Sequence, residues 1–220
     1  MKPSTGHEPR KYPLQRRAKL TVAAILEAAA HILESGGLVA MNTNRVAERA
    51  GVSIGSLYQY FPTREAILSA LIRQERSRLL ATVTLAANQP GDVFAALSAM
   101  MDAAVAHQLE RPLLSRALEL AELGLPLDEE ARVLNIRLVE QLQKLLLQID
   151  IRDTDTIARD LVGMVKGMVD AAGWHGEHDA AGLKRRVASA VFAYLSMNMT
   201  DGAVIPEAFR PYAGMALRRG

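Results

Sequence analysis

The sequence predicts an all-α fold, and three observations lead to that prediction. The 220-residue chain is 50% hydrophobic but only 5% aromatic, and its apolar residues are mainly Ala, Leu, Val and Met, a mixture that favours helix over strand. Apolar residues recur at helical spacing in segment after segment, and no useful length alternates with period two. Glycine and proline mark the breaks between these segments.

The same composition narrows the class of protein. The chain is apolar enough to bury a sizeable core, so we do not expect disorder. It contains no cysteine, which excludes a disulfide framework and a thiolate metal site and suits a reducing cytoplasm. No apolar stretch approaches the roughly 20 residues of a membrane span, and the N-terminus lacks the apolar centre of a secretory signal. We therefore expect a cytoplasmic protein without a membrane partner.

The net charge of +2 conceals an asymmetry along the chain. Residues 1–90 hold 12 Lys/Arg and 6 Asp/Glu, whereas residues 91–220 hold 14 and 18. A basic first part on an acidic remainder is typical of a protein with a polyanionic partner at one end, although a solvated surface can show the same asymmetry. This pattern favours a nucleic acid as the partner.

The breaks divide the chain into helices. We expect a first helix from about Thr21 to the glycine pair 36–37, and then two short helices, Asn44 to Ala50 and Ile54 to Tyr60. Thr43, Ser53 and Thr63 are the expected N-caps of the two short helices and of the long helix that fades near residues 88–91. Four or five further helices are expected, at about 92–109, 112–123, 127–149, 153–175 and 180–199. The expected domains are a flexible basic arm (1–18), a helix-turn-helix domain (19–66, with its recognition helix at about 54–60), a C-terminal helical domain (67–200) and an irregular tail (201–220).

Residues 43–61, TNRVAERAGVSIGSLYQYF, have the composition of a helix-turn-helix. Ala47 is small enough for close helix packing, and Gly51 tolerates the positive φ of a tight turn. The second helix buries Leu57 and turns short polar side chains outward, where they can approach base edges in the major groove. Tyrosine hydroxyls beside them suit phosphates, and Arg64 with the start of the next helix suits another phosphate. The alternative is two packed helices with an ordinary polar face.

The run TNRVAERAGVSIGSLYQYFPTREAIL, within Ile25–Leu71, resembles the N-terminal domain of the TetR/AcrR family of bacterial regulators. The agreement runs through the spacing of Thr43, Ala47, Gly51, Val52, Leu57, Tyr58, Phe61, Glu65 and Leu68. The resemblance implies a three-helix DNA-binding head whose third helix enters the major groove, and a C-terminal helical domain for ligand binding and dimerisation. The implied DNA contacts are Thr43, Asn44, Ser53, Gly55, Ser56, Tyr58, Gln59, Tyr60 and Arg64, the last standing where the family most often has lysine.

The last two expected helices carry continuous apolar stripes that we expect at a homodimer interface. The stripe residues are Ile157, Leu161, Met164, Val165, Met168, Val187, Val191, Tyr194 and Leu195. In the family the last two helices of each subunit pair as a four-helix bundle, and glycines at 163 and 167 would allow close approach. A dimer on a two-fold axis needs half-sites about 34–36 Å apart, hence a pseudo-palindromic operator. The alternative is that these stripes complete the core of the protomer.

An effector pocket is expected within the C-terminal domain, because methionine adapts to varied ligand shapes. The candidate lining residues are Met100, Met101, Met164, Met168 and Trp174, although such methionines can also be plain core. We expect no metal and no cofactor: His175 and His178 lie in a glycine-flanked loop without a fourth ligand at a fixed spacing, and His107 stands apart.

These features predict a bacterial, nucleoid-associated transcriptional repressor that a small-molecule effector releases from a double-stranded operator. An enzyme is not expected, because the sequence has no phosphate-binding glycine loop, nucleophile elbow or zinc-binding histidine pair. The alternative is a DNA-binding scaffold of the same fold that recruits a protein partner without a small-molecule effector.

Overall fold

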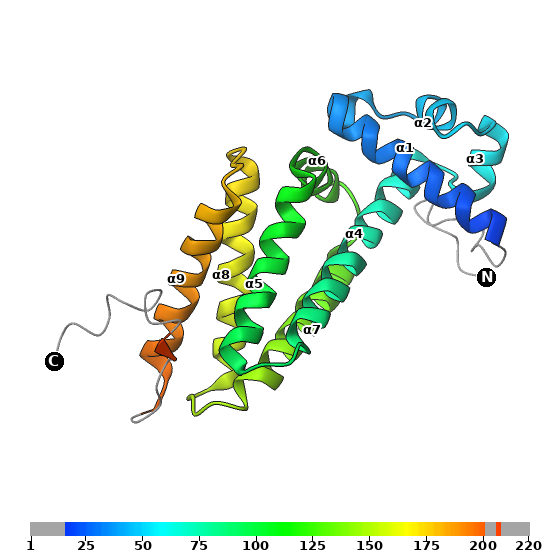
Figure 1. Cartoon of the computed structure of the whole chain (residues 1–220). Coiled ribbons are helices and arrows are strands. Elements are labelled where there is room, and N and C mark those ends of the chain that lie inside the picture. The colour runs from blue at the N-terminus through cyan, green and yellow to red at the C-terminus, as the bar shows by residue number, and fades with distance from the viewer. Residues whose placement is uncertain (1–15, 201–205, 208–220) are drawn as a thin grey trace. The chain divides into compact units, whose positions relative to one another are not determined.

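A computed structural model describes residues 16–200 and 206–207, so the first 15 residues of the predicted arm and most of the predicted tail lie outside the described chain. Within these residues the chain forms nine helices, labelled α1 to α9 in Figure 1. The described ranges contain no strand beyond an isolated antiparallel bridge between Ile151 and Met199. The all-α prediction is confirmed.

The helices pack as two compact units. The first unit comprises the chain up to Ser77 together with Arg111–Asp128, and the second comprises Arg78–Glu110 together with the chain from Glu129 onward. The long helix α4 (Arg64–Ala87) therefore contributes to both units. The domain division predicted at residue 66 is different, since it assigns residues 111–128 to the C-terminal domain; that division stays a prediction.

Helix α1 (Arg16–Ala40) is longer at both ends than the sequence predicts. It begins at Arg16, so residues 16–18 of the predicted arm are helical. Gly37 has a non-helical φ of 62° and ψ of −167°, so the regular helix is interrupted at the glycine pair, where the sequence predicts its end. Helical residues resume beyond this kink and reach Ala40.

The two short helices of the first unit are fixed by side-chain caps and one left-handed glycine. Helix α2 (Thr43–Ala50) is capped by Asn42, whose Oδ1 accepts a hydrogen bond from the N–H of Arg45 at 3.0 Å. The prediction that Thr43 is the cap is wrong, because Thr43 is already the first helical residue. Gly51 ends α2 with a φ of 66°, and Ser53 caps α3 (Ile54–Tyr60) as predicted.

A single apolar core joins the helices of the first unit. Helix α6 (Pro112–Glu122) packs against α1 in this unit, and α2 packs against both α1 and α3. Leu33 of α1, Leu57 of α3 and Leu114 of α6 are each at most 1% exposed in this core. Helices as short as α2 and α3 are unstable alone. Burying each such leucine contributes roughly 1.5–3 kcal/mol, so tertiary packing holds them in place.

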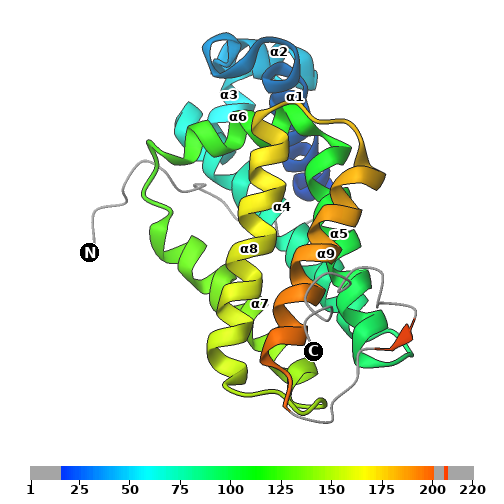
Figure 2. The same cartoon turned by 90° about the vertical axis from the view of Figure 1, so that its left-hand side faces the viewer.

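The second unit has a core of its own. Its remaining helices are α5 (Val93–Glu110), α7 (Asp128–Leu146), α8 (Thr154–Trp174) and α9 (Ala180–Asn198). Helices α5, α8 and α9 pack against one another, and α8 and α9 run side by side in Figure 2. The rings of Phe94 and Phe192 meet in this core with centroids 6.2 Å apart. Asp153 and Asp179 are the N-caps of α8 and α9, and each side chain accepts a hydrogen bond from a backbone N–H of its helix.

Among the described residues, one helical segment is long and apolar enough to cross a membrane by length and composition alone. This segment is Arg17–Ala40 of α1. Ile25, Ala29 and Ile32 of this helix are buried in the core of the first unit. A core helix passes the same test of length and composition, so the apolar character of α1 is explained by its packing.

Candidate nucleic-acid interface

Helix α3 has one buried and one exposed side. Leu57 is fully buried, and Phe61, directly after the helix, is 1% exposed. The exposed residues around this helix are Ser53, Ile54, Gly55, Tyr58 and Gln59. Because residues four apart share a helix face, the outer side has two columns, Ile54 with Tyr58 and Gly55 with Gln59. Six of the nine predicted contact residues are exposed, while Thr43, Ser56 and Tyr60 are half-buried.

Ser53, the N-cap of α3, and Ser56, inside the helix, use their hydroxyls at the helix start. Ser53 Oγ accepts a hydrogen bond from the N–H of Ser56 at 3.0 Å, and the two hydroxyl oxygens lie 2.8 Å apart. This satisfies one of the backbone donors that every helix start leaves unpaired. A Cβ at Gly55 would meet only Ser53 Oγ, at 3.9 Å, so the space in front of the helix at this position is open.

A hydrogen bond links the start of α2 to the outer face of α3. Thr43 Oγ1 and the Tyr58 hydroxyl lie 3.1 Å apart, and either oxygen can donate. Asn44 beside them is exposed. Tyr60 lies on another side of α3 and packs partly against the core, so its ring is less available than that of Tyr58.

The start of α4 carries a charged pair. The Thr63 hydroxyl accepts a hydrogen bond from the N–H of Ala66 at 3.1 Å, which confirms Thr63 as a cap. Arg64 Nε donates to Glu65 Oε1 at 3.1 Å, and both side chains are solvent-accessible. Burial alone would raise the pKa of Glu65, but hydrogen bonds from its own backbone amide and from Arg64 outweigh that effect and lower it. Arg64 is therefore at the surface, in contact with a carboxylate that remains ionised.

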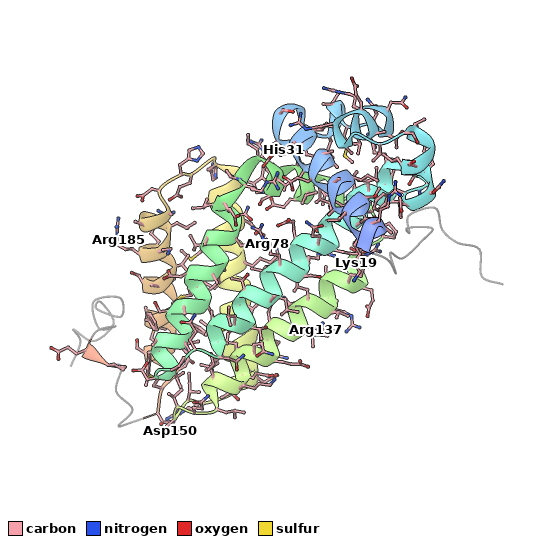
Figure 3. The ribbon with its side chains drawn as sticks, turned by 45° about the vertical axis from the view of Figure 1, so that its right-hand side comes forward. Lys19, His31, Arg78, Arg137, Asp150 and Arg185 are labelled. Carbon is pink, nitrogen blue, oxygen red and sulfur yellow. The ribbon has the colours of Figure 1, made fainter. Side chains whose placement is uncertain are left out.

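The same unit carries further exposed cations. Arg17 and Lys19 lie on the first turns of α1, and Arg49 lies on α2 (Lys19 is labelled in Figure 3). Arg45 of α2 donates from Nη1 to the carbonyl of Ala40 at 3.0 Å and thereby ties α2 to the end of α1. Positive charge on this unit agrees with the charge asymmetry of the sequence and suits a polyanion.

A charged cluster that no sequence motif indicates joins α1 to α6. Arg111 donates from Nε and Nη2 to the carboxylate of Glu34 at 2.6 and 2.8 Å, and from Nη1 to Glu27 at 3.2 Å. The two ring nitrogens of His31, labelled in Figure 3, each lie 3.2 Å from one of these carboxylates. Hydrogen bonding to Arg111 lowers the pKa of Glu34, and the same contact raises the pKa of Arg111. The cluster fixes the first residues of α6 against the helix-turn-helix unit.

The predicted effector residues are only partly brought together. Met101 is buried, and Met100, Met164 and Met168 pack around the same core of the second unit. Trp174, the last residue of α8, is 45% exposed and is not among the residues that form this core. Four of the five candidate residues therefore belong to one apolar cluster.

Part of the predicted dimer interface requires correction. Ile157, Leu161, Val187, Val191 and Leu195 are at most 3% exposed within one protomer, so the protomer itself has already buried them. These five residues therefore follow the alternative interpretation, in which the stripes complete the core of the protomer.

The rest of that predicted interface stays a prediction. Its residues are half-buried on α8 and α9, namely Met164, Val165, Met168 and Tyr194. Gly163 and Gly167 are exposed, and a Cβ on either would meet nothing within 4 Å.

Two short helices joined by a tight turn, with the second one packed on a core by its apolar side, define a helix-turn-helix protein. The chain belongs to the TetR family of bacterial regulatory proteins. The model described as "Bacterial regulatory proteins, tetR family" matches residues 25–71. The model described as "Tetracyclin repressor-like, C-terminal domain" matches residues 94–195, so that the two matches together cover more than half of the chain. The resemblance inferred from the sequence is confirmed.

Named relatives share part of this chain. The HTH-type transcriptional repressor KstR of Mycolicibacterium smegmatis is 34% identical over 94 residues, which are 43% of this chain and 46% of that protein. The nucleoid occlusion factor SlmA of Haemophilus influenzae is 37% identical over 71 residues, 32% of this chain and 33% of that protein. The chain thus matches less than half the length of these curated relatives.

Solved structures share the fold over most of the chain. SmeT, the repressor of a multidrug efflux pump of Stenotrophomonas maltophilia, in its complex with triclosan, has a TM-score of 0.64 at 21% identity, covering 85% of this chain and 95% of SmeT. A transcriptional regulator of Rhodococcus has a TM-score of 0.64 at 25% identity, covering 86% of this chain and 98% of that one. Both likenesses span helices of the two units.

Proposed function

We propose that the chain is a sequence-specific DNA-binding transcriptional regulator that acts as a repressor. The observation that carries this proposal is the orientation of α3, which buries Leu57 in the core and turns Tyr58 and Gln59 to the surface. A helix presented in this way fits the major groove, where base edges differ for all four base pairs. The relatives named as transcriptional repressors support the sign of regulation.

The proposed contacts divide into two classes. Phosphates are bound by the Thr43–Tyr58 pair and by Asn44, Tyr60 and Arg64, which hold the helix in register without reading sequence. Base edges are read from the face that contains Gln59, whose amide can donate and accept at once. Gly55 and the two short serines keep that face shallow, so that the backbone can approach the bases.

We further propose that the protein binds its operator as a homodimer through the outer faces of α8 and α9. Met164, Val165, Met168 and Tyr194 are the predicted interface residues that the protomer leaves partly accessible. Two recognition helices on one two-fold axis require a pseudo-palindromic operator with half-sites about one helical turn apart.

A small-molecule effector is proposed to bind in the second unit and to control DNA binding. The support is the match of residues 94–195 to a tetracycline-repressor-like C-terminal domain, and the similar fold of SmeT, solved with triclosan bound. An effector that binds better to a conformation unable to reach both half-sites shifts the population away from the operator. Helix α4 contributes residues to both units, and we propose that it transmits the conformational change from the effector site to the DNA-binding helices.

One observation favours a second function. The relative SlmA is named as a nucleoid occlusion factor, and its name does not mention transcription. A chain of this kind would bind DNA with the same head and recruit a protein partner through the second unit. Unchanged operator affinity across a broad panel of small apolar and phenolic compounds, with a partner protein captured on operator DNA, would support this second function.

Selection from a random duplex library tests the proposed function. We expect the selection to enrich a pseudo-palindromic sequence. We also expect the logarithm of the observed binding constant to fall linearly with the logarithm of the salt concentration. Arg64→Ala should weaken binding to all duplexes and flatten this slope, whereas Gln59→Ala should relax preference at one or two base positions per half-site. Absence of binding to duplex DNA at low salt would contradict the proposal.

A further inference from the structure

The outer face of α3 contains a residue that polar readout does not explain. Ile54 is the first residue of the helix and is 38% exposed, in the same column as Tyr58. Its neighbours on this face are Ser53 and Gly55, both exposed and small. The accessible part of this aliphatic side chain stays in contact with water in the free protein, so covering it on binding is favourable. Single exposed apolar residues are common on proteins, so exposure alone does not indicate a function. The location of Ile54 at the start of the recognition helix is what indicates one.

The polar groups next to Ile54 are already engaged. Ser53 Oγ is bonded both to the N–H of Ser56 and to the Ser56 hydroxyl. The Tyr58 hydroxyl is bonded to Thr43 at 3.1 Å. Each of these hydroxyls keeps donor or acceptor capacity beyond the bonds that it makes here, so the hydroxyls suit polar partners on the DNA. At the start of α3, Ile54 is the exposed side chain that suits an apolar partner.

Helix geometry places Ile54 where bases are read. In helix-turn-helix proteins the N-terminal residues of the recognition helix contact base edges. The major groove offers one apolar group to such a residue, the C5-methyl of thymine. A β-branched side chain has little rotamer freedom, so it loses little entropy when it is fixed against a methyl group.

We propose that Ile54 is a specificity-determining residue that reads a thymine in each half-site by packing on its C5-methyl group. This inference rests on the proposed function, because it requires α3 to lie in the major groove. It adds an apolar contact with a base to the proposed polar contacts, since none of the predicted contact residues is aliphatic. In a symmetric dimer the thymine occurs twice, at positions related by the operator dyad.

The test is a double-mutant cycle that compares the DNA affinities of wild type and Ile54→Ala on duplexes with and without one thymine methyl group. Deoxyuridine in place of thymidine removes only the C5-methyl and leaves base pairing intact. The probe is the duplex selected from a random library, with each thymine replaced singly. Wild-type protein should bind about fourfold more weakly at one thymine position per half-site, the loss expected for one buried methyl group. Ile54→Ala should bind the thymine duplex more weakly and should be insensitive to deoxyuridine at that position.

Two variants control the cycle. Gln59→Ala, which alters the adjoining column, should keep the full deoxyuridine penalty at that position. Ile54→Val, which retains a branched apolar side chain, should keep part of it. Thermal unfolding of each variant shows whether the head remains folded, as the exposure of Ile54 leads us to expect.

The outcomes separate the inference from the function on which it rests. Selective binding without any deoxyuridine-sensitive thymine, or an equal penalty in wild type and Ile54→Ala, overturns the role of Ile54 and leaves the proposed function intact. Failure of the wild type to bind any duplex overturns both.

Discussion

The hydroxyl oxygens of Thr43 and Tyr58 lie 3.1 Å apart, so a hydrogen bond joins the first residue of α2 to the outer face of α3. Both residues are proposed phosphate contacts. The bond reduces the freedom of the Tyr58 side chain before DNA is bound, which lowers the entropic cost of fixing it on a phosphate. The two hydroxyls are therefore expected to act as one unit in the complex.

Tyr58→Phe tests this coupling. Loss of one hydroxyl should weaken binding to every duplex by about three- to tenfold, the effect of a hydrogen bond worth roughly 1 kcal/mol. Thr43→Val should have a similar effect, and the double variant should lose less than the product of the two. Fluorescence anisotropy with selected and unrelated duplexes measures all four proteins. Strictly multiplicative losses would show that the two hydroxyls act independently.

The cap of α2 is open to a direct stability test. Asn42→Ala removes the side chain that accepts from the N–H of Arg45, and should lower the free energy of unfolding by about 1 kcal/mol. Thr43→Ala is the matched control and should cost less, because Thr43 is inside the helix and alanine is the better helix former. Urea denaturation followed by circular dichroism measures both. A larger loss for Thr43→Ala than for Asn42→Ala would restore Thr43 as the cap.

Two glycines of the helix-turn-helix should respond in opposite ways to alanine. Gly51 has a φ of 66°, so Gly51→Ala should cost roughly 1–2 kcal/mol of stability. Gly55 is helical with open space before it, so Gly55→Ala should leave stability unchanged or raise it by up to about 1 kcal/mol. Its new methyl group should nevertheless weaken operator binding, because it separates the helix from the bases. Full operator affinity in Gly55→Ala would argue against close backbone approach at this position.

The Arg111 cluster predicts a pH-dependent stability. Arg111→Met leaves Glu34 without its guanidinium, and should lower the free energy of unfolding by roughly 2 kcal/mol near pH 7. The pKa of Glu34 is lowered in the folded state, chiefly by hydrogen bonding to Arg111. The contribution is therefore present above the ordinary value of 4.5 and is lost as the pH falls through the lowered pKa.

Urea titrations of wild type and Arg111→Met at pH 7, 5, 4 and 3 measure this effect. The difference between the two proteins should be largest at pH 5 and above and should shrink toward pH 3. Arg132→Met, which breaks the exposed pair with Glu129 on α7, is the control and should show no measurable change. A difference that grows on acidification would contradict the assignment.

Most of the fold could be predicted because its signals are local. Glycine and proline at Gly51, Pro62, Pro112 and Gly124 mark breaks that the helices respect within a few residues. Local signals do not give every boundary. The glycine pair at 36–37 interrupts α1, as expected, but helical residues resume beyond the kink and reach Ala40.

Some features of the candidate site could likewise be predicted from the sequence, and others could not. The exposed face of α3 follows from helical periodicity, so it was predictable. The contacts of Arg111 with Glu27 and Glu34 were not, because they join residues 84 and 77 positions apart with no motif between them. The apolar stripes of α8 and α9 have the same periodicity whether they face the core or a partner, and only packing shows that Ile157 and Leu195 are inside.

The central claim is that α3 enters the major groove twice, on a symmetric pair of subunits. The chain has no cysteine, so Gln59→Cys provides one attachment point for an iron chelate that cleaves nearby DNA. We predict cuts on both strands in two clusters, each across a major groove, related by a dyad and separated by about 34 Å. Arg132→Cys, at an exposed position of α7, is the control and should give no such clusters. A single cluster, a pattern shared with Arg132→Cys, or no cleavage of bound duplex would contradict the account.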